Sequence, residues 1–124
     1  MEQPTRDGPE ATYLQALREG RFVFQRSADG RAVFPPRLAE PGSGAALDWF
    51  VCAGRGSIHA MTEQPRKPPA RSRFIAIVEM DEGFRLLSQI DAENAPAIGD
   101  RVVARIHSQA DPPFVDFIPD AAYG

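Results

Sequence analysis

The stretch FIAIVEMDEGFRLLSQI, residues 74–90, decides the fold of this chain. From Phe74 to Met80 the side chains alternate between two faces, as is typical of a β-strand. Asp81-Glu82-Gly83 follows as a short polar break with a glycine, which indicates a tight hairpin turn. A second apolar run begins at Phe84. The stretch therefore predicts two antiparallel strands joined at residues 81–83.

Strand-like runs continue on both sides of this hairpin. Glycine or proline separates most of them, and the 124 residues include 12 prolines and 10 glycines. After residue 20, no segment keeps a helical period for more than about three turns. The further runs are LDWFVCAG (47–54), GSIHAMTE (56–63), RVVARIHS (101–108) and FVDFIP (114–119). We therefore predict a mainly β fold, in which residues 47–124 form a small barrel of five to six strands.

The N-terminal third of the chain has a different sequence pattern. Residues 1–20 predict a polar, disordered tail over 1–9 and then a short helix over 10–19, which Gly20 ends. Tyr13, Leu14 and Leu17 share one face of that helix, and we expect this face to dock on the domain or on a partner. Residues 21–46 predict short strands separated by turns. The turn signals there are Asp29-Gly30, Pro35-Pro36 and Pro41-Gly42.

Charge is spread unevenly along the chain, whose formal net charge is −3. Residues 55–73 carry five cations against Glu63 alone, whereas residues 74–124 carry three arginines against nine acids. A short basic segment on an acidic body indicates a local anion site more than a surface for long nucleic acid.

The absence of targeting signals and the number of cysteines predict the location of the protein and exclude some kinds of site. No apolar stretch reaches 18 residues, and the N-terminus MEQPTRDGPE lacks the pattern of a signal peptide, so we expect a cytoplasmic protein with no membrane association. Cys52 is the single cysteine, which excludes an intrachain disulfide and a zinc site of several thiolates.

The ordered set of segments resembles a family of acyl-CoA-associated OB-fold proteins with an N-terminal rubredoxin-like zinc ribbon. These are accessory proteins of thiolases and hydratases, of the domain-of-unknown-function type. The resemblance covers about 110 residues. The segments that carry it are ATYLQALREGRFVFQR (11–26), FPPR (34–37), LDWFVCAGRGSIHAMT (47–62), FIAIVEMDEGFRLLSQI (74–90), AIGDRVVARI (97–106) and PFVDFIPD (113–120).

The sequence departs from that family at the ribbon. The resemblance implies a Cys-x-x-Cys pair in each of two knuckles, but aligning on the FPPR step places other residues there. They are Arg26 or Ser27, then Asp29, Glu40 and Ser43. Zinc prefers cysteine and histidine, and two carboxylates alone do not hold a structural zinc. We therefore expect a degenerate, metal-free ribbon over 21–46, with no zinc and no other cofactor.

The resemblance implies a non-catalytic function. The chain would associate with a thiolase-like or hydratase-like enzyme and help to bind or present acyl-CoA, as part of a homo- or hetero-oligomer. Two alternatives stay open: an OB module that binds single-stranded nucleic acid, and a CoA-ester hydrolase. The first is disfavoured because most aromatic residues are phenylalanines within strand runs. The second is disfavoured because no nucleophile and base can be paired from the sequence.

The proline-rich loop between two strands, residues 65–73, is the strongest candidate for ligand binding. Its cations could meet the phosphates of coenzyme A, since arginine suits charge-assisted contacts to phosphate. A solubilising loop is the equal alternative. Arg55, in the Gly54-Arg55-Gly56 bend, could join the same site. The predicted CoA-binding residues are Arg55, Arg66, Lys67, Arg71 and Arg73.

The remaining candidate residues are expected to have structural roles. His59 lies on the face opposite Ile58, where it lines a ligand groove or, as we favour, is a solvated strand residue. Cys52 could accept an acyl group, but its apolar neighbours favour a core residue. Glu79, Asp81 and Glu82 at the hairpin are expected to be solvated. No catalytic residue is predicted.

Overall fold

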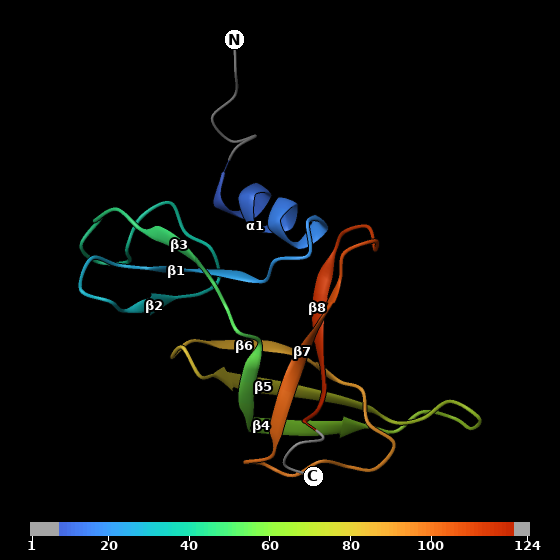
Figure 1. Ribbon diagram of the computed structural model, residues 1–124. Helices are drawn as coiled ribbons and strands as arrows, with labels where there is room; N and C mark the ends of the chain where they lie inside the picture. The colour runs from blue at the N-terminus through green and yellow to red at the C-terminus, as the bar shows by residue number, and fades with distance from the viewer. Residues whose placement is uncertain (1–7, 121–124) are drawn as a thin grey trace.

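The computed structural model describes residues 8–120, which form one helix and eight strands (Figure 1). The helix and the strands of the small sheet are α1 (Pro9–Arg18), β1 (Val23–Arg26), β2 (Ala32–Val33) and β3 (Asp48–Val51). The barrel strands are β4 (Arg55–Gln64), β5 (Arg73–Met80), β6 (Arg85–Ile90), β7 (Arg101–His107) and β8 (Phe114–Pro119). Most of the tail expected at residues 1–9 lies outside the described residues.

The barrel is closed, with the strand order β4-β5-β6-β8-β7. All neighbours pair antiparallel except β6 and β8, which run parallel. The hairpin that the sequence predicts is present, since Phe74 pairs with Ile90 and Glu79 with Arg85. The alternation within β5 also holds, because Phe74, Ala76, Val78 and Met80 are buried. The predicted mainly β fold with an N-terminal helix and a five-stranded barrel is confirmed.

The first barrel strand differs from the expectation. The run 47–54 was expected to open the barrel, but β3 pairs with β1, through Val51 opposite Val23 and Asp48 opposite Arg26. It belongs to a separate three-stranded sheet with the order β2-β1-β3. The chain passes into the barrel at Gly54, whose φ of +82° suits a residue without a side chain. Gly56 is equally constrained, because a Cβ there would lie 2.6 Å from the carbonyl oxygen of Glu79.

The helix, the small sheet and the barrel share one hydrophobic core. Leu17 of α1 is fully buried, which confirms that the apolar face of the helix docks on the domain. Phe24 of β1 stacks on Phe84, directly before β6, with ring centroids 4.9 Å apart, and Phe34 also stacks on Phe84 with centroids 5.1 Å apart. These aromatic contacts join the ribbon-like segment to the barrel without a metal.

The loop between β4 and β5 projects from the barrel (Figure 1). It contains residues 65–72 and most of the basic segment. Pro68 and Pro69 prevent it from pairing as a strand, so it lies on the surface as expected. Within residues 8–120, no helix has both the length and the apolar character needed to cross a bilayer.

Candidate functional site

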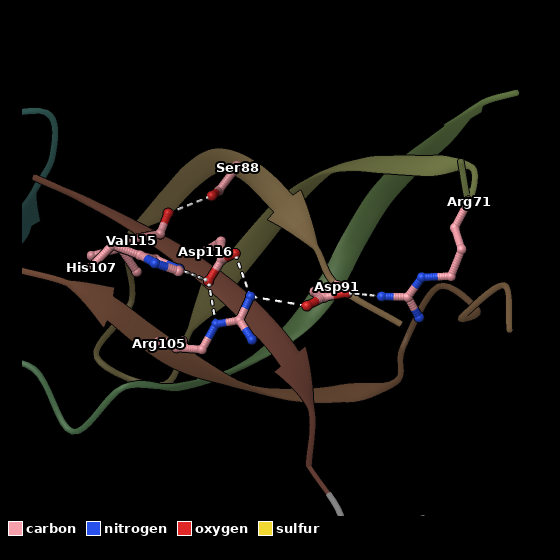
Figure 2. A network of polar contacts seen from close by, with 7 residues as sticks. All are labelled: Arg71, Ser88, Asp91, Arg105, His107, Val115 and Asp116. Carbon is pink, nitrogen blue, oxygen red and sulfur yellow. Dashed lines mark hydrogen bonds and ion pairs between the residues drawn. The ribbon is translucent and has the colours of Figure 1, made fainter. Parts of the chain in front are cut away.

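A network of charged side chains joins β7, β8 and the residue after β6 to the loop between β4 and β5 (Figure 2). Arg105 of β7 and Asp116 of β8 are direct partners in the antiparallel register. The Nε of Arg105 donates a hydrogen bond to Oδ1 of Asp116 at 3.0 Å, and Nη2 donates to Oδ2 at 2.8 Å. This paired contact fixes the plane of the guanidinium, because both of its bonds are to one carboxylate.

The network continues from the barrel into the basic loop. Asp91 follows the end of β6, and its two oxygens accept hydrogen bonds from two different arginines. Nη2 of Arg105 donates to Oδ2 at 3.0 Å, and Nη2 of Arg71 donates to Oδ1 at 2.8 Å. Arg66 donates from Nε to the carbonyl oxygen of Arg71 at 2.7 Å. The loop is therefore tied to the barrel end through Arg71 and is closed on itself by Arg66.

His107 completes the network on its other side. Its Nε2 lies 2.8 Å from Oδ1 of Asp116, and its ring stacks on Phe114 with centroids 4.3 Å apart (Figure 2). Burial of Asp116 raises the pKa of its carboxyl, but the hydrogen bonds from Arg105 and His107 outweigh this and leave the pKa below its usual range. Hydrogen bonds to Asp116 and Asp91 raise the pKa of Arg105. Asp116 and Arg105 therefore both stay charged at neutral pH.

A hollow of about 140 Å³ lies between the loop and the barrel end. We call it the barrel-end hollow. Its charged lining consists of Arg66, Arg71, Arg73, Arg105, Asp91 and Asp116, and Ser72 and Gln89 add polar groups. Four cations against two carboxylates leave it positive. It is a small cationic site with ordered guanidinium groups.

The structure brings some of the predicted CoA-binding residues together and separates others. Arg66, Arg71 and Arg73 line the barrel-end hollow, while Lys67 belongs to the same loop but is not part of the lining. Arg55 lies at the opposite end of β4, about 30 Å of strand away. There its Nη1 bonds to Asp120 at 2.9 Å.

Sequence reasoning missed Asp91, Arg105 and Asp116. No local motif marks them, because 11 to 20 residues separate the partners in each contact. Only the register of β7 against β8 and the turn after β6 place them beside the loop.

His59 lies away from this network. Its strand shifts register between Ile58 and Ala60, which leaves His59 at a β-bulge with an exposed side chain. It lines a separate, open hollow of about 380 Å³ together with Glu79 and Asp81. Ile58 is buried and His59 is exposed, which agrees with a solvated strand residue, and a role for His59 in a ligand groove stays a prediction.

Cys52 is a buried residue of the core, as expected. Its Sγ donates to Oε1 of Glu82 at 3.2 Å, and the N–H of Ala53 donates to Oε2 at 2.8 Å. Burial and the Glu82 carboxylate raise the pKa of the thiol to about 12. The expectation that Glu82 is merely solvated is wrong, because its carboxylate anchors the chain between β3 and β4. Asp81 likewise forms a double hydrogen bond with Arg101, and Glu79 pairs with Arg85.

The residues at the expected zinc positions bond to one another within each turn. Ser27 donates a hydrogen bond to Asp29, and Ser43 donates to Glu40 at 2.7 Å. Arg31 lies between the two turns, with Nη2 4.0 Å from Asp29 and Nη1 3.8 Å from Glu40. Within residues 8–120, no group of three or more histidine, cysteine or carboxylate side chains could hold a metal ion.

Comparisons with known proteins agree with this fold. Residues 49–107 match the family model described as ChsH2, C-terminal OB-fold domain. The structure is similar to a chain of a solved structure described as the Ltp2-ChsH2(DUF35) aldolase, with a TM-score of 0.74 and 26% sequence identity. The match covers 94% of this chain and 98% of that chain. A comparison with curated proteins gives no match.

The fold and the closed barrel define an OB-fold protein. More narrowly, residues 49–107 resemble the C-terminal OB-fold domain of ChsH2, and the whole chain is similar to a chain of a structure that carries the DUF35 designation.

Proposed function

We propose that this chain is a non-catalytic accessory protein that associates with a thiolase-like or hydratase-like enzyme and helps to bind or present acyl-CoA. The observation that carries the proposal is the likeness to a chain of the Ltp2-ChsH2(DUF35) aldolase, which extends over nearly the full length of both chains. The description of that structure pairs two proteins in one aldolase. We propose that this chain is the non-catalytic subunit of such an assembly.

The side-chain chemistry of the described residues supports a non-catalytic role for this chain. The Cys52 thiol is buried, has a pKa raised to about 12 and donates to a carboxylate, so it is a poor nucleophile. His107 is engaged by Asp116 and stacked on Phe114. Neither group has the paired base and open approach that an acyl-transfer site needs.

The basic loop supports binding of a phosphate-bearing ligand. Arg66 and Arg71 of the loop and Arg73 at the start of β5 line the barrel-end hollow, and the contact with Asp91 orders the side chain of Arg71. The proposed contact with CoA therefore rests on Arg66, Arg71 and Arg73, with Lys67 nearby in the same loop. Arg55 is far from this site and is not needed for it. No zinc or other cofactor enters the proposal.

Binding of single-stranded nucleic acid has less support. OB modules of that kind stack bases on aromatic side chains exposed along a cationic groove. Here Phe22, Phe24, Phe74, Phe84 and Phe117 are buried in the core. Phe114 is exposed, but one face of its ring is covered by His107.

The proposal that the chain does not turn over acyl-CoA is tested with the purified protein. Acetyl-CoA and longer acyl-CoA esters are incubated with the chain, and release of the free CoA thiol is followed. We expect the rate of spontaneous hydrolysis at every protein concentration. Release that increases in proportion to the chain would contradict the non-catalytic role and would favour the CoA-ester hydrolase.

A further inference from the structure

We propose that the barrel-end hollow is a binding site for a dianionic phosphate monoester, which in the proposed acyl-CoA function is the 3′-phosphate of coenzyme A. This assignment rests on the proposed function for the identity of the ligand. The site itself rests on charge, geometry and size at the barrel end. Each of these is independent of the likeness to known proteins.

The charge of the hollow matches such a group. Four guanidinium groups and two carboxylates line it, so the lining carries two positive charges in excess. The lowered pKa of Asp116 and the raised pKa of Arg105 keep that balance fixed at neutral pH. A phosphate monoester has a second pKa of about 6 and carries close to two negative charges at pH 7. A phosphodiester or a carboxylate carries only one.

The geometry prepares the arginines for a ligand. Asp116 holds Nε and Nη2 of Arg105, and Asp91 holds the Nη2 groups of both Arg105 and Arg71. Within residues 8–120, Nη1 of neither guanidinium has a hydrogen-bond partner in the network. The aspartates therefore hold the two cations close together against their mutual repulsion and leave donors for an anion. Ordering the donors in advance lowers the entropy lost on binding.

The size of the hollow limits what it can take. Its volume is about 140 Å³, whereas a liquid water molecule occupies about 30 Å³. One phosphoryl group with a few waters fits this space. The side chain of Arg71 is 54% exposed and that of Arg105 is 40% exposed, so solvent weakens each contact. We therefore expect weak binding by the isolated chain, in the millimolar range.

The test compares CoA with 3′-dephospho-CoA, which differs only in lacking the phosphate monoester. Each ligand is titrated into the full ¹⁵N-labelled chain at low ionic strength, and backbone and arginine Nε–Hε signals are followed by NMR. We expect CoA to bind about tenfold more tightly, since hydrogen bonds to charged groups are stronger than neutral ones. The largest shifts should fall in residues 66–73 and at Arg105.

Variants test which arginines make the chain prefer CoA over 3′-dephospho-CoA. Arg71→Ala combined with Arg73→Ala should bind the two ligands equally weakly, and Arg37→Ala, an exposed arginine outside the hollow, should keep the tenfold preference. If the double variant is unstable in a thermal melt, Arg73→Ala alone should still reduce the preference, because Arg73 bonds to no carboxylate of the network. Equal affinity of the wild type for both ligands, or shifts confined to residues away from the loop and Arg105, would overturn the proposal. Either result leaves the accessory role to be decided by its own test.

Discussion

Arg105 on β7 and Asp116 on β8 face each other across the antiparallel ladder and are joined by two hydrogen bonds of 3.0 and 2.8 Å. The Asp116 side chain is only 14% exposed, and Arg105 and His107 both donate to or contact its oxygens. This pair is thus the best shielded of the contacts between arginine and aspartate in the network. It links the closing strands of the barrel to Asp91 and, through it, to the basic loop.

Replacing Asp116 by Asn should destabilise the fold by about 1–2 kcal/mol at pH 7, because the variant removes the doubly hydrogen-bonded carboxylate and leaves Arg105 with Asp91 as its remaining charged partner. The pKa of Asp116 is lowered in the folded chain, so its contribution is present above its unfolded value of about 3.9 and is lost as the pH falls through the folded value. Urea unfolding of both proteins from pH 7 to pH 2.5 measures the difference.

The control for Asp116 is Asp111→Asn, since Asp111 is exposed in the loop before β8. This variant should unfold like the wild type at pH 7. Asp81 also has a lowered pKa through Arg101, so acid unfolding of the wild type alone does not isolate Asp116. A difference between the wild type and Asp116→Asn that stays constant from pH 7 to pH 2.5 would contradict the assigned role.

A second contact fixes the passage from the small sheet into the barrel. Glu82 at the β5–β6 turn accepts hydrogen bonds from the Ala53 N–H and the Cys52 thiol. Glu82→Ala should lower the free energy of unfolding by about 0.5–1.5 kcal/mol, because it removes the hydrogen bonds to the Ala53 N–H and the Cys52 thiol. Glu93→Ala, at an exposed position after β6, is the matched control and should have no effect. Equal stability of the two variants would show that the Glu82 contact is unimportant.

The hairpin of residues 74–90 was predictable because its two strands are adjacent in sequence and its turn is marked by Gly83. The partner of β3 was not, since the pattern of Trp49, Phe50 and Val51 indicates a strand without indicating which sheet it joins. The basic loop could be found from composition, whereas the carboxylates that order it could not. Asp91 and Asp116 reach Arg71 and Arg105 only through the pairing of β6, β7 and β8.

Cys52 should react slowly with alkylating reagents in the folded protein. With a pKa of about 12, only about one thiol in ten thousand is ionised at pH 8, and the side chain is buried. We expect iodoacetamide to modify the native chain at least about 100-fold more slowly than the urea-unfolded chain, where the pKa returns to about 8.5. Mass spectrometry of timed samples measures both rates. Rapid, complete modification of the native chain at pH 8 would show that the thiol is accessible.

The purified chain should contain no zinc. Serine and carboxylate side chains stand at the expected ligand positions and bond to one another, as Ser43 does to Glu40. Elemental analysis of protein purified without chelator should give much less than one zinc per chain, and a chelator should leave the melting temperature unchanged. One zinc per chain, or a melting temperature that falls with chelator, would contradict a metal-free ribbon.

Affinity purification of the tagged full chain from its own cells, followed by mass spectrometry of the proteins that remain bound, tests the accessory role most directly. A tagged Glu93→Ala chain provides a second bait with an unaltered barrel end. We predict that a thiolase-like or hydratase-like enzyme co-purifies with both baits in a fixed ratio to the chain and elutes with it as one complex on gel filtration. Recovery of the chain without such an enzyme, together with release of CoA from acyl-CoA by the chain alone, would contradict the account.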